Sequence, residues 1–547
     1  GICVVLIVLM LGGATIWALR DGWTPVSDVA LLQLRLDRMI VDPAQVGVYS
    51  RYGWFHPGPA YLWFMWLPYE LIGPAWLIVG AVVLQMGGLL LAWQFARRLS
   101  VTAGGIALVA ALVVLWVRPA DQAMLPWNPY MSIVGGLTVV LAAWNAAERR
   151  RLGAVLLLPL GSFLMQAHVG TASLVALTTL AALGLMLLPR SGARPPWVWW
   201  LIGAAMALVM WLPPLWDQLA GSHNLSALTK AMLGAGDTAG WGQALAAWSQ
   251  AYGRSPSWLS FTGNLPTQAA TPWLLLIPIA ALLVAVVVRQ GRGLHLRLLA
   301  ILAAANLAAP LAVAGIQGPA MEYLVAWIPA VATATVAMSV WVLLDCVRGL
   351  DSTPQATVGA LRLSMALGLA SVVGAGAVAW TWAHAPLPFS SEGAAARHLS
   401  QALQVDASGQ RAVIVRPESA SDRLAAVEQG TLADAVAAGV DVAPDAVTAA
   451  WIGGGGADDP ASRVRYTVVN WDPYFVTPPG QDLADIYDPF TREQWQRIRE
   501  IDQRIAAAGD DQRQKYLLGL ELAQVTGGQQ AYGLVRLDPL QPAPAGN

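Results

Sequence analysis

An aspartate near the start of the first polar stretch, Asp28, is the first residue whose position suits chemistry. It begins an amphipathic segment, 28–40, in which apolar residues alternate with charged ones. The N-terminus of a helix favours negative charge, so a carboxylate there stays ionised and can accept a proton. The pair Ser27-Asp28 is also a common helix-start signal, and on spacing alone a capping role is the more frequent one.

A rigid, sharply turned loop is expected over residues 49–59, which read Tyr-Ser-Arg-Tyr-Gly-Trp-Phe-His-Pro-Gly-Pro. Glycine and proline on both sides of His56 restrict the course of the chain. Arg51 and His56 can then be held near a phosphate at the level of the lipid headgroups, where guanidinium forms paired hydrogen bonds with phosphate oxygens. The alternative is that Arg51 pairs with lipid headgroups while His56 braces the turn.

Further polar and aromatic residues stand at the ends of apolar segments that lie far apart in the sequence. Polar side chains at membrane depth are costly and tend to be functional, although a histidine at such an edge is more often structural. The distribution of arginine over the loops predicts that all of these polar and aromatic residues face the same side of the membrane. This convergence matters more than any single motif. The motifs are Trp127-Asn128-Pro129-Tyr130, Gln166-Ala167-His168, Trp216-Asp217-Gln218 and Glu322-Tyr323.

Long apolar segments must position these residues. A bilayer core about 30 Å thick requires about 20 apolar residues for each helical span. Of the 547 residues, 56% are hydrophobic and only 12% are charged. The chain is therefore predicted to be a polytopic α-helical membrane protein with about eleven transmembrane helices. The segments fall near 1–19, 73–96, 102–117, 131–147, 152–167, 169–188, 197–215, 272–288, 298–316, 323–345 and 361–381.

Arginine is concentrated in alternate loops, which predicts the orientation because cytoplasmic loops carry the excess of Lys and Arg. The N-terminus is then cytoplasmic, the loops with the polar motifs face outward, and the C-terminal region is extracytoplasmic. We expect a multi-pass protein of a bacterial cell membrane. The arginine-bearing loops are 97–98, 149–151, 190–194, 289–297 and 348–362.

A change of charge near residue 386 marks a domain boundary. Through Pro386 there are 19 basic and 12 acidic side chains, and the remainder holds 13 and 21, from totals of 32 and 33. We therefore expect a transmembrane domain over 1–385 and a soluble extracytoplasmic α/β domain over 386–547. Its predicted strands and helices are 412–415, 419–437, 464–470 and 491–508, by their apolar periodicity.

Sequence signals for several other functions do not occur. The chain has no Gly-x-x-x-x-Gly-Lys phosphate loop, no Gly-x-Ser-x-Gly elbow, no His-Glu-x-x-His motif and no paired cysteine motif. ATP-driven transport and zinc-dependent hydrolysis are therefore disfavoured. The lack of a basic patch in the sequence disfavours nucleic acid as a partner.

The order of these motifs resembles that of the GT-C superfamily of polyprenyl-phosphate-sugar-dependent glycosyltransferases, particularly bacterial members akin to actinobacterial arabinofuranosyl- and mannosyltransferases. A first span is followed by an outer loop with an early aspartate and then by the motif of residues 49–59. The resemblance covers about residues 1–385, and the tail is similar only as an extracytoplasmic C-terminal domain. The later motifs are Trp-Asn-Pro-Tyr at 127–130, Gln-Ala-His-Val-Gly at 166–170 and Trp-Leu-Pro-Pro-Leu-Trp-Asp-Gln-Leu at 211–219.

The resemblance implies a hexosyl- or pentosyltransferase of the cell envelope whose catalytic carboxylate is Asp28. Many members carry two adjacent acidic residues there, whereas this chain has Ser27-Asp28. Whether Asp28 acts alone or with Asp37, Asp42 or Asp217 stays open. The implied reaction is an inverting displacement, in which Asp28 as general base takes the proton of an acceptor hydroxyl.

The remaining roles implied by the resemblance follow from that mechanism. The charge of the leaving lipid phosphate would be stabilised by nearby cationic groups. Aromatic residues would supply faces on which the sugar stacks. The phosphate-binding residues would be Arg51, His56, Arg35 and Arg38. The substrate-binding residues would be Tyr49, Trp54, Trp127, Asn128, Tyr130, His168, Asp217, Gln218 and Glu322.

The implied partners are a polyprenyl-phosphate-sugar donor, a glycan or glycolipid acceptor, and membrane lipids. No cofactor is expected beyond the lipid-linked donor. The use of a divalent cation stays open, because the sequence shows no cluster of metal ligands. The competing class is a transporter or flippase of lipid-linked saccharides. Transporters often carry internal repeats and charges in mid-span, whereas here the charges lie in the loops.

Overall fold

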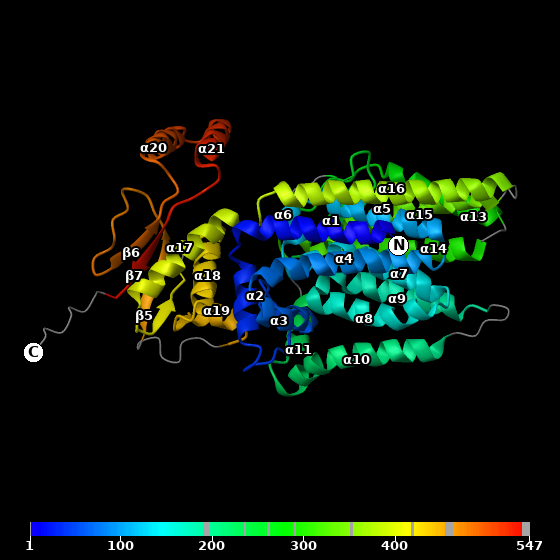
Figure 1. Cartoon of the computed structure of the whole chain (residues 1–547), viewed down its shortest axis with the longest axis horizontal. Helices are drawn as coiled ribbons and strands as arrows, with labels where there is room; N and C mark the ends of the chain where they lie inside the picture. The colour runs from blue at the N-terminus through cyan, green and yellow to red at the C-terminus, as the bar shows by residue number, and fades with distance from the viewer. Residues whose placement is uncertain are drawn as a thin grey trace, which may run out of the picture. The chain divides into compact units, whose positions relative to one another are not determined.

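The computed structural model describes residues 2–189, 196–234, 237–256, 259, 263–288, 292–349, 354–416, 421–454 and 463–538. The chain forms two compact units (Figure 1). The first consists of Gly1–Asp21 and Asp42–Pro388. The second consists of Gly22–Val41 and Phe389–Asn547.

The first unit is built from long helices that run along a common direction (Figure 1). Each predicted apolar segment forms one of them, because a chain in hydrocarbon must pair its own peptide groups, as a helix does. They are α1 (Ile2–Ala18), α4 (Ala75–Arg97), α5 (Val101–Val117), α7 (Ser132–Ala147), α8 (Arg151–Ala167), α9 (Ala172–Leu187), α10 (Trp197–Ala220), α13 (Leu276–Val287), α14 (Arg292–Ala314), α15 (Ile328–Gly349) and α16 (Pro354–His384).

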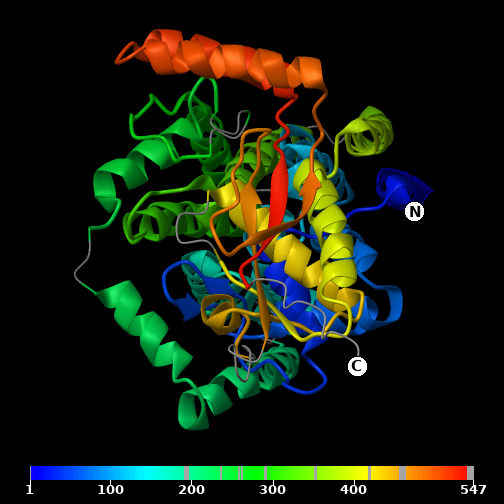
Figure 2. The same cartoon turned by 90° about the vertical axis from the view of Figure 1, so that its left-hand side faces the viewer.

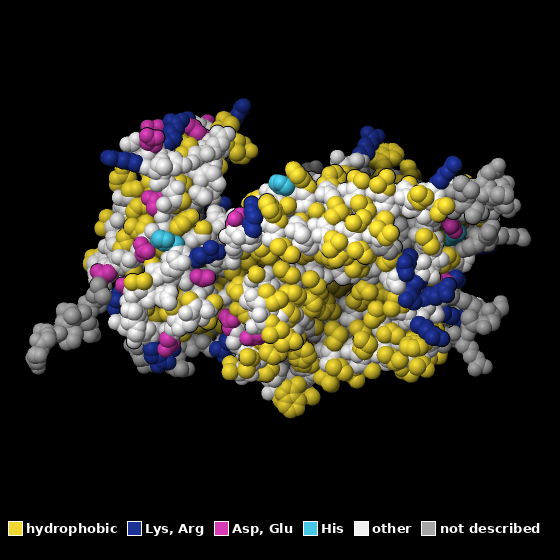
Figure 3. All heavy atoms as spheres, in the orientation of Figure 1, with side chains coloured by type: hydrophobic (Ala, Val, Ile, Leu, Met, Phe, Trp, Pro, Cys, Tyr) yellow, Lys and Arg dark blue, Asp and Glu magenta, His cyan; other side chains and the backbone are white. Residues whose placement is uncertain are grey.

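Eight helices in the described part of the chain are long and apolar enough to cross a membrane. The helices over 101–117, 151–167 and 273–287 are apolar but shorter. Hydrophobic side chains cover most of the visible face of this unit (Figure 3). The polytopic helical architecture is therefore confirmed, whereas the number of eleven spans stays a prediction.

Short elements connect the long helices. Among them is a hairpin of two strands, in which Tyr49 pairs with Phe55 and Ser50 with Trp54. Helix α3 follows this hairpin and is rich in aromatic side chains. The short elements are η1 (Leu19–Asp21), β1 (Tyr49–Ser50), β2 (Trp54–Phe55), α3 (Ala60–Ile72), α6 (Ala120–Met124), η2 (Asn128–Met131), η3 (Val169–Thr171), α11 (Asn224–Leu233), α12 (Gly240–Gln250), η5 (Trp273–Leu275) and η6 (Glu322–Val325).

Lys and Arg side chains gather at one end of the first unit (Figure 3). The Arg149 guanidinium, after α7, donates to the carbonyl oxygens of Met186 at 2.8 Å and Leu188 at 2.9 Å. Arg297 of α14 donates through Nη2 to Glu148 at 2.8 Å. Two of the arginines predicted to lie in cytoplasmic loops, Arg149 and Arg297, thus bind groups at the ends of neighbouring helices.

The second unit contains a five-stranded mixed sheet with the strand order β4-β3-β5-β7-β6. Strand β3 is parallel to β4 and β5, whereas β7 is antiparallel to β5 and β6. Helices α17 and α18 pack on this sheet (Figure 2). The elements are α2 (Asp28–Asp37), α17 (Ser390–Asp406), β3 (Ala412–Ile414), α18 (Asp422–Ala437), β4 (Val442–Pro444), α19 (Ala446–Trp451), β5 (Val464–Asn470), β6 (Asp482–Tyr487), α20 (Arg492–Ala507), α21 (Gln512–Thr526) and β7 (Tyr532–Arg536).

Helix α2 belongs to the second unit, although the sequence-based division placed it in the transmembrane domain. Ala30 and Leu34 lie in the same buried cluster as Leu399 and Val427. The Gln33 amide donates to the Ala433 carbonyl oxygen at 3.2 Å. The apolar face of α2 thus lies in the core of the second unit, with its main contacts to α18.

We predict that Leu34→Ala loosens the second unit. The Leu34 side chain is 4% exposed within that cluster, and its truncation leaves a cavity that costs about 2–4 kcal/mol. Hydrogen exchange of peptides from α2 and α18, measured in the full chain, should accelerate accordingly. The matched control is Ile40→Ala, because Ile40 is 68% exposed. Equal exchange in the two variants would contradict the packing of α2 described above.

Candidate functional site

The hairpin of β1 and β2 brings Arg51 to the surface of the first unit. Gly53, with φ of 81°, occupies the turn, a conformation that glycine adopts without strain. The exposed Arg51 guanidinium donates to the Tyr52 hydroxyl at 3.1 Å and to the Pro319 carbonyl oxygen at 3.3 Å. It also lies over the Tyr323 ring, 5.5 Å from its centroid. A cation is thus fixed in place while part of it still faces outward.

Aromatic rings continue from Arg51 toward the loop before α7. The Tyr323 and Trp127 rings are 4.5 Å apart, and Trp127 meets Tyr130 edge-on at 5.1 Å. Trp127 is half-buried, whereas Tyr130 is 7% exposed. Trp127 and Tyr130 are both predicted to bind substrate, and of this pair only Trp127 retains much accessible surface.

A buried ion pair lies beside these rings. Arg118, just after α5, donates through Nη1 to Glu322 at 2.9 Å and to Gln122 at 3.3 Å. Both charged side chains are buried, and separating such a pair leaves an uncompensated charge. Glu322, predicted to bind substrate, therefore joins the loops at 118–122 and 322–325.

The two predicted histidines lie together, with ring centroids 4.8 Å apart. The Val169 amide donates to His56 Nδ1 at 3.3 Å, and the Gly170 amide donates to His168 Nδ1 at 3.1 Å. Burial, and then the neighbouring His168, lower the pKa of His56 well below its usual value. His56 is thus neutral at pH 7, so its role in binding phosphate cannot rest on positive charge.

Two amide side chains join this end of the bundle. Asn128 donates to the Ala167 carbonyl oxygen at 2.7 Å. Gln166 accepts from the Ala60 amide at 3.2 Å and donates to the Met210 carbonyl oxygen at 2.9 Å. Gly58 lies against the Gln166 amide so closely that a Cβ atom would not fit. The Asn128 side chain therefore holds the backbone at Ala167 in place and is not exposed to a ligand.

Asp217 and Asn224 hold the hairpin from the other side. The Asp217 carboxylate accepts from the Ser222 hydroxyl at 2.8 Å and from the Asn224 backbone amide at 3.0 Å. The Asn224 side chain accepts from the Phe55 amide and donates to the Phe55 carbonyl oxygen, both at 2.9 Å. Asp217, which the sequence suggested as a substrate ligand, thus positions Asn224.

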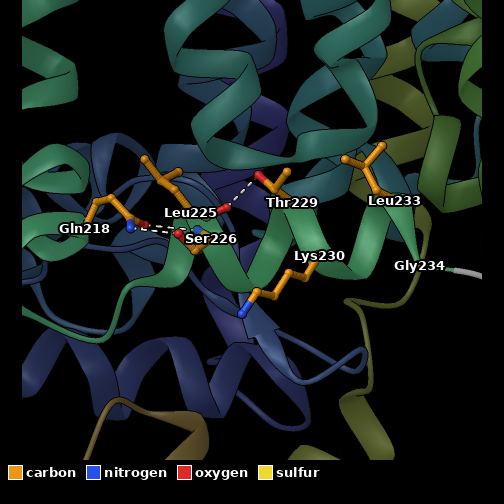
Figure 4. Close-up of a pocket in the computed structure, with 7 residues that line it drawn as sticks. All are labelled: Gln218, Leu225, Ser226, Thr229, Lys230, Leu233 and Gly234. Carbon is orange, nitrogen blue, oxygen red and sulfur yellow. Dashed lines mark hydrogen bonds between the residues drawn. The ribbon is translucent and has the colours of Figure 1, made fainter.

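A groove with a volume of about 680 Å³ runs along α11 (Figure 4). Leu225 and Leu233 supply its apolar wall, and Lys230 lies along the same helix. The Gln218 side chain exchanges two hydrogen bonds with Ser226, at 2.8 and 3.0 Å. The remaining lining residues are Ser226, Thr229 and Gly234.

The groove adjoins the Arg51 hairpin. Gln317 donates to the Ala231 carbonyl oxygen on α11, and its own carbonyl oxygen accepts from the Tyr52 hydroxyl at 3.1 Å. One residue thus contacts both the helix that lines the groove and the residue next to Arg51. An amphipathic groove and an exposed guanidinium therefore occupy one end of the first unit.

The other predicted residues of the hairpin differ in exposure. The Trp54 ring stacks on Tyr52 at 5.9 Å and is 9% exposed, so it supports the hairpin from beneath. Tyr49 packs edge-on against Phe55 at 5.4 Å. Trp54 therefore offers little surface on which a sugar could stack.

Asp28, Arg35 and Arg38 belong to the second unit. Asp28 is the exposed first residue of α2, and the preceding Ser27 makes no side-chain capping bond. Arg35 and Arg38 are half-buried on the same helix, and the Arg35 guanidinium lies against Gly453. The side-chain capping role for Ser27 is therefore wrong.

Several residues of this end of the first unit were missed from the sequence. Arg118 carried a usable signal, since it is an arginine in a short loop assigned to the side opposite the arginine-rich loops. Asn224 gave none, because its partners are the backbone atoms of Phe55, far away in the sequence. Tyr323 stood in a motif noted from the sequence, but its contacts with Arg51 and Trp127 were not predicted. No group of three or more His, Cys, Asp or Glu side chains gathers in the described parts of the chain in a way that could hold a metal.

Comparison with known proteins gives structural similarities alone. No family model and no curated protein matches the chain. Its structure is similar to that of ArnT from Cupriavidus metallidurans in the apo state, with 14% identity, 85% of this chain and 92% of that chain covered, and a TM-score of 0.47. ArnT bound to undecaprenyl phosphate matches with 14% identity, coverage of 85% and 93%, and a TM-score of 0.45.

An Archaeoglobus fulgidus oligosaccharyltransferase is similar at 11% identity, with 85% of this chain and 69% of that chain covered and a TM-score of 0.40. A TM-score below 0.5 leaves the function of this chain to be inferred from its own residues.

We predict that Asn224→Leu loosens the hairpin. The change removes both hydrogen bonds to Phe55 and leaves two backbone groups without their partner, at a cost of about 1–3 kcal/mol. Hydrogen exchange of the 49–56 peptide should accelerate. Ser226→Ala, two residues further along α11, is the control and should leave that peptide unchanged. An unaltered exchange rate in Asn224→Leu would show that the side chain does not hold the hairpin.

Proposed function

We propose that this protein is an integral membrane glycosyltransferase that moves a sugar from a polyprenyl-phosphate donor to an extracytoplasmic glycan or lipid acceptor. The observation that carries the proposal is the gathering, at one end of an apolar helix bundle, of an exposed Arg51, aromatic rings and an amphipathic groove. A lipid-borne phosphosugar has a matching charged group, a sugar ring and an apolar chain.

The donor is assigned to the groove and the hairpin. The prenyl chain would lie against Leu225 and Leu233, and its phosphate would meet Lys230 or Arg51. Guanidinium binds phosphate oxygens through paired hydrogen bonds, and an ammonium group acts as a point charge. Trp127 and Tyr323, next to Arg51, would contact the sugar.

The reaction would be an inverting displacement with Asp28 as general base. The acceptor hydroxyl oxygen bonds to the anomeric carbon while its proton passes to the Asp28 carboxylate. The bond between the anomeric carbon and the phosphate oxygen breaks, and polyprenyl phosphate leaves with the electron pair. Cationic side chains would stabilise that charge, a role that the resemblance of the sequence assigns to Arg51, Arg35 and Arg38. Asp28 stands at the first position of α2, where the helix favours its ionised form.

The nature of the sugar is the finer part of the proposal. A hexose or a pentose would be transferred, with mannosyl and arabinofuranosyl transfer as its two forms. Transfer from polyprenyl-phosphate-mannose and from polyprenyl-phosphate-arabinose, assayed in parallel, distinguishes them. The predicted orientation, with a cytoplasmic N-terminus, would place the acceptor outside the cell membrane.

We predict that Asp28→Asn abolishes transfer while the protein still folds. Loss of a general base lowers the rate by about 10²–10⁴-fold. Asp422→Asn is the matched control and should retain activity, because Asp422 is likewise the exposed first residue of a helix in the second unit. The measurement is sugar transfer from the two donors by purified protein in lipid nanodiscs. Undiminished transfer by Asp28→Asn would refute its role as base, and flipping of the lipid without transfer by the native protein would favour a transporter.

We also predict that Arg51→Gln and Lys230→Gln each weaken use of the donor, about tenfold or more, because each removes a charge that phosphate would contact. Arg51→Lys should lose less, since it keeps the charge but not the paired donors. The dependence of the transfer rate on donor concentration is the readout. Arg254→Gln is the control, because Arg254 stacks on Trp273 at 5.4 Å. A loss in the control equal to that in both variants would contradict the assignment.

A further inference from the structure

Helices α20 and α21 form a hairpin at one edge of the second unit (Figure 2). Each packs mainly on the other, and among the described residues neither packs extensively on α17 or α18. Arg504 of α20 donates to Glu521 of α21 at 2.9 Å, and the Gln494 side chain donates to the Val525 carbonyl oxygen at 3.2 Å. The hairpin is therefore held together from within, and its outer surfaces can meet a partner.

The two faces of α21 differ in composition. Its inner face carries Leu518, which is buried, and Glu521, which pairs with two arginines of α20. On its outer face, the side chains of Tyr516, Leu517 and Leu520 are between 47% and 67% exposed. Residues three and four apart share one side of a helix, so these three side chains lie together. A folded domain that shows such an apolar patch ordinarily uses it to bind.

The charge beside this patch is positive. Arg513 is exposed and stands one turn before Leu517, on the same side of α21. The acidic side chain within this helix, Glu521, is turned toward α20 by its ion pairs. Asp511, just before the helix, caps it by accepting from the Gln514 backbone amide at 3.0 Å. The outer face thus combines two leucines and a tyrosine with a guanidinium.

The second unit is tethered beside a lipid bilayer. It is joined to the first unit at three points of the chain, between residues 21 and 22, 41 and 42, and 388 and 389. The first unit has helices long and apolar enough to cross a membrane. Because the tether is intramolecular, lipid is present next to the second unit at a high effective concentration.

The chemistry of the outer face matches the surface of a bilayer. An amphipathic helix lies at that surface with its apolar side chains at the boundary between headgroups and acyl chains. Tyrosine is enriched at the level of the headgroups, and cationic side chains are attracted to anionic lipids. A saccharide fits less well, because leucine side chains offer it neither hydrogen bonds nor a flat ring.

We propose that the outer face of α21 binds the lipid bilayer, with Tyr516, Leu517 and Leu520 at the boundary of the acyl chains and Arg513 at the lipid phosphates. The hairpin then gives the second unit a contact with the membrane besides its three connections along the chain. This inference requires only that the first unit spans a bilayer. It is therefore independent of the proposed sugar transfer, which its test does not measure.

The test uses the full chain in nanodiscs of phosphatidylcholine and phosphatidylglycerol in equal parts. A small share of the phosphatidylcholine carries a photoactivatable diazirine high on one acyl chain, and mass spectrometry identifies the peptides that irradiation joins to it. We expect labelling of the 512–526 peptide in the native protein. The double variant Leu517→Gln, Leu520→Gln should lower this labelling about tenfold, because both leucines that enter the bilayer are lost. Arg513→Gln should lower it about fivefold, since one cation near an anionic surface is removed.

Val405→Gln is the matched control, because Val405 is an exposed apolar residue of the same unit near the end of α17. It should leave the labelling of the 512–526 peptide unchanged. Peptides of α1 should be labelled in every variant, and hydrogen exchange of α18 verifies that each variant is folded. The proposal is overturned if lipid labels α1 but not the 512–526 peptide of the native protein. It is also overturned if the double variant is labelled as strongly as Val405→Gln.

Discussion

A hydrocarbon layer offers no partner for an unpaired peptide group, and this constraint determines where the first unit can be irregular. Its long helices pair their own backbone, so turns, 3₁₀ segments and the β1–β2 hairpin are confined to the helix ends. The polar side chains of these segments then bind the backbone of other loops, as Arg51 binds the Pro319 carbonyl oxygen. Loops far apart in the sequence therefore meet in one place.

Much of the polar chemistry at that place is used to hold the backbone. Asp217 fixes Asn224, and Asn224 fixes Phe55 next to the predicted His56. His56 and His168 accept backbone amides through Nδ1. A site that must discriminate between substrates needs such support, because a displacement of about 1 Å weakens both binding and catalysis. Arg51 is valuable to this site because it is held by neighbours and still exposed.

The sequence predicts the helical architecture well because apolar length is a strong, local signal. The strand at 464–470 and the helix at 491–508 were also correctly predicted, whereas β4, β6 and β7 were missed. Strand β4 has three residues, and β6 mixes Asp with apolar residues, so neither shows a clear period. Roles of single residues were harder to predict. Glu322 looked like an open carboxylate, and only tertiary structure reveals Arg118 as its partner.

Helix α2 has a consequence for how the protein is made. Its apolar face packs against Leu399 and Val427, residues that the ribosome adds more than 350 positions later. During synthesis the side chains of Ala30 and Leu34 therefore stay uncovered until α17 and α18 have been made. The second unit can only be completed by a segment made more than 350 residues before Leu399, so these two parts of the chain mature together.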